Sequence, residues 1–229
     1  VLVPAIVVFL AACSEQRADP VTRREPAPSS PSQMRAGPMP SPSPRSNPSP
    51  TKSRDGKEDV VVVRYMLVRK VSDEATADFG RMAEGTLSDP RGWERAGFDL
   101  IRRPRARYRV VLAEGEVVDR LCLPYETYGT YSCQNGPVVA LNADRWRTAT
   151  PKWTGTLAGY KRMLVNHEFG HLLGQHHPEV QCPQPGRKAP IMAQQSTELN
   201  GCLPNPWPLP HEIKRAARHD LPLAPGYGK

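Results

Sequence analysis

The order of secondary-structure patterns in this 229-residue chain predicts an α+β fold. Short runs of β-branched and other apolar residues, which indicate strands, gather in the middle of the chain. One long helical pattern follows them, and the sequence after it is irregular until a short helix near the end. Strands and helices that are largely segregated in this way are typical of the α+β class.

Five segments are predicted to be strands because they are rich in β-branched or alternating apolar residues. They are Val60–Val68, Phe98–Arg102, Tyr108–Ala113, Tyr128–Cys133 and Val138–Asn142. The turn-forming residues Gln134-Asn135-Gly136 lie between the last two segments, so we expect those two to form a hairpin.

Three helices are predicted from apolar residues at helical spacing and from end signals. The first follows Ser72, a good N-cap residue, and should end near Gly85. The second and longest spans roughly Ala158 to Leu173, and Gly174 is its stop signal. The third is short and covers Glu212 to His219.

Composition excludes two classes of protein. No apolar run reaches the roughly 18 to 20 residues that a transmembrane helix needs, which excludes a multi-span membrane protein. The formal net charge is +8, but the chain has no Lys/Arg run of the kind that marks a nucleic-acid-binding arm. We therefore expect no nucleic-acid partner.

Residues 1–12 have the pattern of a secretory signal peptide. Val1 to Leu10 is almost wholly apolar, and small residues follow it. The tetrad Leu10-Ala11-Ala12-Cys13 resembles the lipobox of bacterial lipoproteins, which implies cleavage before Cys13 and lipidation of its sulfur. We expect an exported protein anchored in the cell membrane and facing outward. A plain signal peptide with an incidental Cys13, and hence secretion, is the alternative.

Residues 13–58 are expected to form a disordered tether and residues 59–229 a single folded domain. The stretch from Ser14 to Glu58 contains 10 prolines and 9 serines, and Val21 is its only branched aliphatic residue. Such a segment cannot bury enough apolar surface to offset the entropy cost of ordering it. It would hold the folded domain away from the membrane.

Residues 167–177 read HEFGHLLGQHH and carry the candidate chemistry. A helix places His167 and His171, four residues apart, on one face, with Glu168 beside them. Gly174 permits a left-handed turn that ends the helix and can bring His177 back to the other two imidazoles. Three imidazoles would then hold a zinc ion and leave a fourth position for water. An amphipathic helix with surface histidines is the plainer alternative.

This pattern resembles the signature of the metzincin zinc metalloproteases, HExxHxxGxxH followed by a turn that carries a methionine. The matching residues are His167, Glu168, His171, Gly174 and His177, with Met192 as the Met-turn methionine. The chain also resembles a family of exported actinobacterial proteins that have metzincin-like motifs and no assigned function. That second resemblance is carried by Val165–Glu168, Cys182-Pro183, Pro190–Met192 and Asn200–Pro208.

The metzincin resemblance implies both a fold and residue roles. The fold would be a twisted, mostly parallel sheet with an antiparallel edge strand, an active-site helix, and an irregular C-terminal part with the Met-turn and a short helix. Zinc would be bound by His167, His171 and His177. Glu168 would be the general base for the zinc-bound water, and Met192 would form a hydrophobic floor under the zinc.

Some neighbouring residues leave alternatives open. His176 could replace His177 as a ligand if the turn after Gly174 differs, and Glu198 could be a third ligand of the thermolysin kind. Some metzincins carry a tyrosine two residues after the methionine, where it helps to stabilise the tetrahedral intermediate. Gln194 stands at that position, so zinc or another donor would have to hold the oxyanion. We expect His211 and His219 at the surface.

The cysteines other than Cys13 form an even set in a chain expected to be exported, which favours disulfides. Of the three possible pairings we favour Cys122 with Cys133 and Cys182 with Cys202, because both close short loops. A zinc site built from thiolates is the alternative, but the chain contains no CxxC pair.

Together these features predict a zinc-dependent endopeptidase that acts as a monomer on protein or peptide at the cell envelope or outside the cell. By analogy with metzincins, an extended substrate would lie along an exposed sheet edge at Tyr128 to Cys133. The alternative is a tethered, zinc-containing binding module for envelope protein or peptidoglycan with little turnover. The intact Glu168 argues against that alternative, because a binding site needs no general base.

Overall fold

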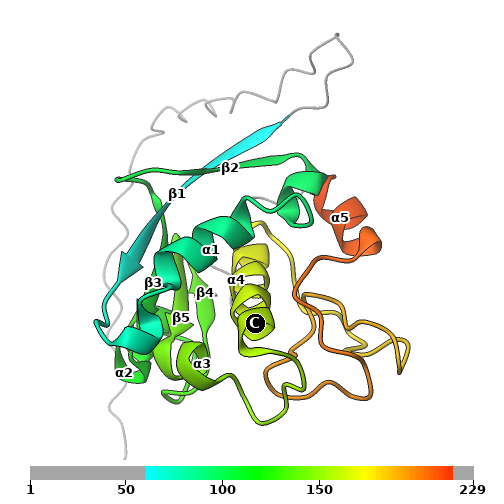
Figure 1. The fold of residues 1–229 in the computed structure, drawn as a ribbon. Coiled ribbons are helices and arrows are strands. Elements are labelled where there is room, and N and C mark those ends of the chain that lie inside the picture. The colour runs from blue at the N-terminus through cyan, green and yellow to red at the C-terminus, as the bar shows by residue number, and fades with distance from the viewer. Residues whose placement is uncertain (1–59, 219–229) are drawn as a thin grey trace, which may run out of the picture. The chain divides into compact units, whose positions relative to one another are not determined.

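The computed structural model describes residues 60–218, so the predicted signal peptide, Cys13 and the tether lie outside the described residues. The strands are β1 Val61–Arg69, β2 Phe98–Arg102, β3 Tyr108–Ala113, β4 Cys133–Asn135 and β5 Val138–Asn142 (Figure 1). The α-helices are α1 Phe79–Leu87, α2 Gly115–Cys122, α3 Ala143–Thr148, α4 Leu157–Leu172 and α5 Pro210–Ala216. Within residues 60–218, no helix combines the length and apolar character needed to cross a membrane.

The strands form one sheet in the order β2-β1-β3-β5-β4. β1 pairs in parallel with β2 and with β3, and β3 pairs in parallel with β5. Parallel neighbours need crossover connections, and helices lie in the segments that link β1 to β2 and β3 to β4. β4 runs antiparallel to β5 at one edge of the sheet. The predicted α+β class, with a mostly parallel sheet and an antiparallel edge strand, is confirmed.

The edge strand is shorter than predicted. Tyr128 and Gly129 both have positive φ, 53° and 62°, so the chain cannot be extended there. The backbone N–H groups of Thr130 and Tyr131 both bond to the carbonyl of Thr127, which closes a turn. The predicted strand Tyr128–Cys133 is therefore wrong except at Cys133, where β4 begins.

The hairpin itself is present, but its turn lies one residue later than predicted. Asn135 pairs with Val138, so the two connecting residues are Gly136 and Pro137. Gly136 has a φ of 53°, a conformation that glycine adopts at little cost.

All three predicted helices exist, but the accuracy of their predicted end positions differs. α4 lies within one residue of both predicted ends, and α5 starts two residues early, at Pro210. The residues after Ser72 form a 3₁₀ turn, Glu74–Thr76, and α1 begins only at Phe79. α1 also runs past Gly85 to Leu87, because Gly85 does not take the left-handed conformation that ends helices.

Two helices, α2 and α3, were not predicted. They contain 8 and 6 residues, too few for a helical period to stand out from the sequence. The start of α3 is fixed by Asn142, whose side-chain oxygen accepts hydrogen bonds from the backbone N–H groups of Asp144 and Arg145.

α4 is the buried centre of the described fold. Figure 1 shows it between the sheet and the C-terminal segment that carries α5. Phe169 meets Tyr65 of β1 edge to face, with ring centroids 5.7 Å apart. On another side, the Trp93 indole donates a hydrogen bond to the Asn166 carbonyl at 3.0 Å. Burying each of these rings fully contributes roughly 2 to 3 kcal/mol, so α4 is firmly placed.

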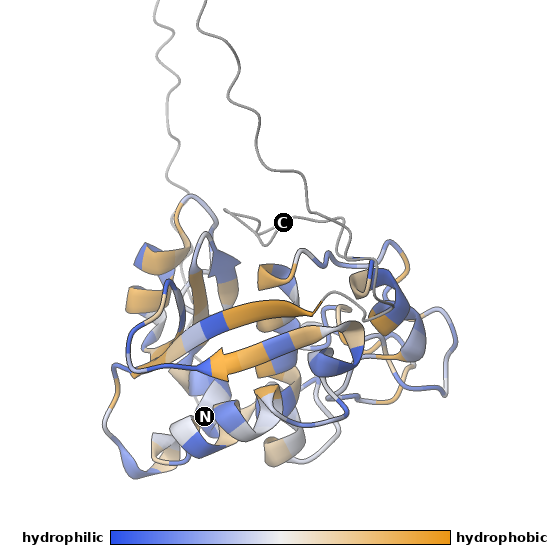
Figure 2. Cartoon of the chain, turned by 90° about the horizontal axis from the view of Figure 1, so that it is seen from above, coloured by the Kyte–Doolittle hydropathy of each residue, from blue (hydrophilic) through white to orange (hydrophobic). Residues whose placement is uncertain are grey.

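Hydrophobic residues concentrate in the strands and in the helices that pack on them, while the connecting segments are mostly hydrophilic (Figure 2). α4 lacks a clear polar face because it is covered on more than one side, and most of its residues are buried. Polar side chains on such a helix are therefore buried too, which is costly unless they have partners or a function.

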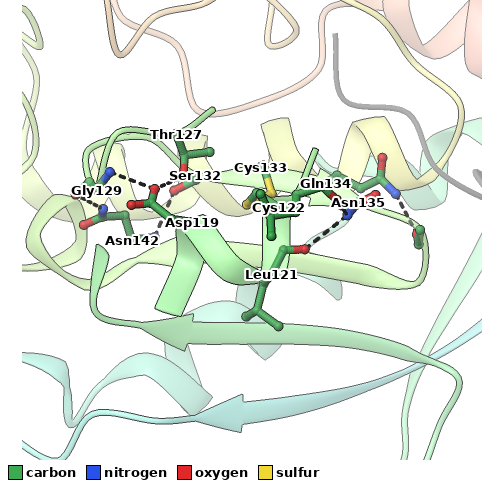
Figure 3. The surroundings of a disulfide bond; sticks show 12 residues. Asp119, Leu121, Cys122, Thr127, Gly129, Ser132, Cys133, Gln134, Asn135 and Asn142 are labelled. Carbon is green, nitrogen blue, oxygen red and sulfur yellow. Dashed lines mark hydrogen bonds between the residues drawn. A yellow bond between two sulfur atoms is a disulfide. The ribbon is translucent and has the colours of Figure 1, made fainter. Parts of the chain in front are cut away.

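Both predicted cysteine pairs lie at disulfide-bonding distance, Cys122 with Cys133 and Cys182 with Cys202. Figure 3 shows that the first pair links the end of α2 to β4. In the same region, the Asp119 carboxylate accepts hydrogen bonds from Thr127 and from the Gly129 N–H. The cysteine pair thus joins the two ends of the loop between α2 and the edge strand, and Asp119 holds its middle.

Candidate metal centre and active site

Three histidines converge at the C-terminal end of α4. His167 and His171 lie one turn apart on the helix and are both buried. Gly174, with a φ of 79°, ends the helix, and the Gln175 N–H closes the turn on the Gly170 carbonyl at 2.9 Å. The turn brings His177 back, so that its Nε2 atom lies 3.2 Å from that of His167 and 3.1 Å from that of His171.

Each helical histidine is oriented by a backbone carbonyl. The Nδ1 atom of His167 lies 2.8 Å from the Ile191 oxygen, and that of His171 lies 2.8 Å from the Gln175 oxygen. A carbonyl only accepts, so both Nδ1 atoms carry the hydrogen and both Nε2 atoms keep a lone pair. This is the arrangement that commonly supports histidine metal ligands.

The residues present fit a zinc ion. One ligand atom from each histidine can be chosen so that all lie within 4.8 Å of one another. Zinc–nitrogen bonds of about 2.0 to 2.1 Å at tetrahedral angles put two ligand nitrogens roughly 3.3 Å apart. The two observed Nε2 separations, 3.2 and 3.1 Å, are close to that value. Three neutral imidazoles are a donor set typical of catalytic zinc sites.

Burial favours the neutral, metal-binding form of the histidines. Burial, with the charge on His177 as the second cause, lowers the pKa of His167 to about 4. The pKa of His171 is held well below its ordinary value, first by burial and then by the neighbouring histidines. Burial also lowers the pKa of His177, with His176 as the second cause.

Glu168 is the buried carboxyl group of the site. It follows His167 on α4, and burial raises its pKa to about 8. A carboxyl group whose pKa is strongly raised by burial in a cavity is typical of a functional site. A cation nearby would stabilise the ionised carboxylate and lower that pKa.

A cavity of about 480 Å³ opens onto the three histidines and Glu168. Its walls come from α4, from residues 125–134 that lead into the edge strand, and from residues 194–197 that follow Met192. The candidate ligands and the candidate base therefore face one space that is large enough for part of a peptide.

Met192 packs beneath the helix of the metal centre. It is fully buried in the turn that also contains Ile191. A Cβ atom on Gly170 would lie 2.5 Å from the Met192 sulfur, so the glycine permits this close approach. Met192 thus packs against α4 at Gly170, next to the ligand candidate His171, and its role as a Met-turn methionine stays a prediction.

Two residues of α5 that support the site were not singled out from the sequence as site residues. The buried Glu212 of α5 accepts hydrogen bonds from the backbone N–H groups of Ile191 and Met192, each at 2.9 Å. Arg215, one turn later, donates to the Gln175 side chain at 2.9 Å. α5 therefore contacts both of the segments whose carbonyls orient the helical histidines.

The remaining candidates stand apart from the histidine cluster. His176 and Glu198 are exposed and do not belong to it, which is against their use as ligands. His211 is exposed on α5, and His219 lies outside the described residues. Gln194 borders the cavity, where its backbone N–H bonds to the Gln181 side chain at 2.7 Å.

A family model described as "Protein of unknown function (DUF3152)" matches residues 54–210. The chain belongs to this family. The part that matches the DUF3152 model includes the three histidines, Glu168, Met192 and both cysteine pairs. A search of curated proteins found no match.

Among solved structures, the fold is similar to a crystal structure of archaemetzincin from Methanopyrus kandleri. The sequence identity is 12% and the TM-score is 0.40. The alignment covers 70% of this DUF3152 chain and 96% of the archaeal chain.

Proposed function

We propose that this protein is a zinc-dependent peptidase, and most simply an endopeptidase. One observation carries the proposal: three histidine Nε2 atoms converge at one end of a cavity that a buried glutamate also lines. A structural zinc site has four protein ligands and is closed, whereas this cluster has three histidines and faces a cavity.

The residues divide into ligands and a base. His167, His171 and His177 would hold the zinc ion through Nε2. When bound, zinc supplies a Lewis acid that polarises the scissile carbonyl and lowers the pKa of water at its open position. The Glu168 carboxylate would accept a proton from the attacking water and then give it to the leaving amine nitrogen.

The substrate would be extended beside the edge strand. β4 is the last strand of the sheet, and Cys133 and Gln134 on it border the cavity. An extended peptide can add to such an edge through backbone hydrogen bonds, which bind it with little regard to its side chains. The edge involved is Cys133–Asn135 and not the predicted Tyr128–Cys133.

The proposed site of action is the outer side of the cell envelope. It rests on the apolar segment Val1–Leu10, on the lipobox-like tetrad that ends at Cys13, and on the proline-rich stretch that follows. We propose a monomer held by lipid on Cys13 that cleaves protein or peptide and has no nucleic-acid partner.

A tethered binding module that holds zinc but has little turnover is the second candidate. The position of Glu168 is the observation against it. A buried carboxyl group costs free energy, and a pure binding site would gain nothing from one beside its metal ligands.

A cleavage assay with an unbiased peptide library tests the proposal. The purified zinc-loaded protein should cleave peptides, lose that activity with a chelator, and regain it when zinc is restored. An inactive protein that elemental analysis shows to be fully loaded with zinc would favour the binding module instead. A protein that takes up no zinc would remove the basis of both candidates.

A further inference from the structure

Arg145 of α3 is a cationic side chain in the wall of the catalytic cavity. Its Nε donates to the Thr130 carbonyl at 3.0 Å, and its Nη1 makes a longer bond of 3.4 Å to the Ala149 carbonyl. A guanidinium group has five N–H donors, and these two carbonyls neutralise none of its charge.

Among residues 60–218, no Asp or Glu forms an ion pair with Arg145. Arg147 offers a direct contrast two residues later on the same helix. It pairs with Asp73, Glu114 and Asp144 and does not line the cavity. Within the described residues, Arg145 thus has no carboxylate partner, whereas Arg147 has three.

Tyr160 of α4 lines the same cavity as Arg145. Burial raises the pKa of the Tyr160 hydroxyl, the hydrogen bond with Ser196 lowers it, and the positive charge of Arg145 also lowers it. Tyr160 precedes His167 by two helical turns, or about 10 Å along α4. One extended residue spans roughly 3.3 Å, so a group bound at Arg145 would belong to a residue within about three positions of the scissile bond.

We infer that Arg145 binds a carboxylate of the substrate, close to the bond that is cleaved. This inference deepens the proposed peptidase function and rests on it. The carboxylate can come from an acidic side chain or from the C-terminus of a short peptide, because both present the same group. An arginine fork matches a carboxylate with two parallel hydrogen bonds, and the half-buried cavity strengthens them.

The size of the expected preference follows from the charge-assisted bonds. Hydrogen bonds to charged groups are typically worth about 1.5 to 3 kcal/mol, which corresponds to roughly 10- to 150-fold in kcat/KM. An isosteric glutamine in the substrate would keep the shape but lose the charge. The Glu-to-Gln rate ratio between matched peptides therefore measures the interaction.

The other role open to Arg145 is purely structural. Its bond to Thr130 holds the loop of residues 127–131 that leads to the edge strand. Under that role, substitution would slow the cleavage of all peptides alike and would leave the Glu-to-Gln ratio unchanged. The ratio therefore separates recognition from loop support.

The experiment compares peptides that carry Glu, Gln or Leu at one of the three positions on either side of the scissile bond, each with a C-terminal acid or amide. The zinc-loaded parent is compared with Arg145→Gln and with the matched control Arg147→Gln. We expect the parent to favour a carboxylate by at least about 10-fold, Arg145→Gln to lose that preference, and Arg147→Gln to keep it. A preference for Glu identifies a side-chain carboxylate, and a preference for the free acid over the amide identifies the C-terminus.

Two results would overturn the inference while leaving the peptidase intact: a parent that cleaves all these peptides equally, or a preference that survives in Arg145→Gln. A zinc-loaded parent that cleaves none of these peptides and none of the unbiased library would instead refute the peptidase function itself. Thermal unfolding of both variants confirms that each is folded when the ratios are measured.

Discussion

Replacing Glu212 by glutamine should weaken the metal centre without touching a metal ligand. Glu212 is buried, and its carboxylate accepts three backbone N–H groups, those of Ile191 and Leu209 on Oε2 and that of Met192 on Oε1. The carbonyl of Ile191 in turn accepts the Nδ1 hydrogen of His167. The carboxylate therefore holds the turn that orients one ligand.

The magnitude follows from the bonds that glutamine cannot make. Its side chain has one acceptor oxygen and one NH₂ group. If the oxygen serves Ile191 and Leu209, the Met192 N–H faces the NH₂ group and has no acceptor. A buried N–H without a partner costs about 1 to 3 kcal/mol, and the two remaining bonds weaken because the acceptor is no longer charged. We expect a loss on the order of 3 to 5 kcal/mol in the free energy of unfolding.

Thermal unfolding and zinc affinity together measure this effect. For a domain of this size the thermal midpoint should fall by roughly 6 to 20 °C. Zinc affinity, measured by competition with a chromophoric chelator, should fall about 10- to 100-fold because the orientation of His167 is less constrained. Glu198→Gln is the matched control, since Glu198 is an exposed glutamate in the same C-terminal segment. If Glu212→Gln matches this control in both measurements, the supporting role of Glu212 is refuted.

Three other outcomes are expected. Gly170→Ala should lower the thermal midpoint by roughly 2 to 12 °C, because the added Cβ would press on Met192. Gly85→Ala is the control and should not lower it, because a Cβ there would meet open space. Equal midpoints of the two variants in calorimetry would contradict the packing around Gly170. Relative to Glu168→Gln, the metal-free parent should lose stability as pH rises from about 5 to 8, because folded Glu168, with its pKa raised to about 8, keeps a proton that the unfolded chain releases. The lowered pKa values of the three histidines are common to both proteins, so urea unfolding of the pair measures the contribution of Glu168, and a stability difference that does not change with pH would count against the buried acid. Cys13→Ser should move the protein from the membrane fraction to the soluble fraction, and unchanged fractionation would end the lipid-anchor proposal.

The histidine cluster could be predicted from sequence because its information is local. His167, Glu168 and His171 are placed by the period of one helix, and Gly174 has the positive φ that its position suggests. The same locality explains the success with β2, β3 and β5, whose alternating or β-branched apolar residues are a local strand signal. Strand propensity alone was misleading at Tyr128, where the loop closes on itself and the backbone is left-handed.

The supports of the site could not be predicted because they depend on tertiary contacts. From the sequence, Glu212 can be recognised only as an acidic residue in the first turn of a helix, three residues after Leu209. That position predicts its hydrogen bond to the Leu209 N–H and no other. Its bonds to Ile191 and Met192 cross about 20 residues of irregular chain. Likewise, no local pattern brings Arg145 of a short, unpredicted helix to the cavity beside α4.

The measurement that tests the central claim most directly is the cleavage rate of Glu168→Gln at full zinc occupancy. Glutamine keeps the shape of the side chain but cannot accept a proton, so zinc content should equal that of the parent. The rate should fall at least about 10²- to 10⁴-fold, the usual contribution of a positioned acid–base group. His167→Ala provides the comparison, because it should lose zinc and activity together. If zinc-loaded Glu168→Gln cleaves peptide at the parent rate, Glu168 is not the base and the mechanism proposed for this site is wrong.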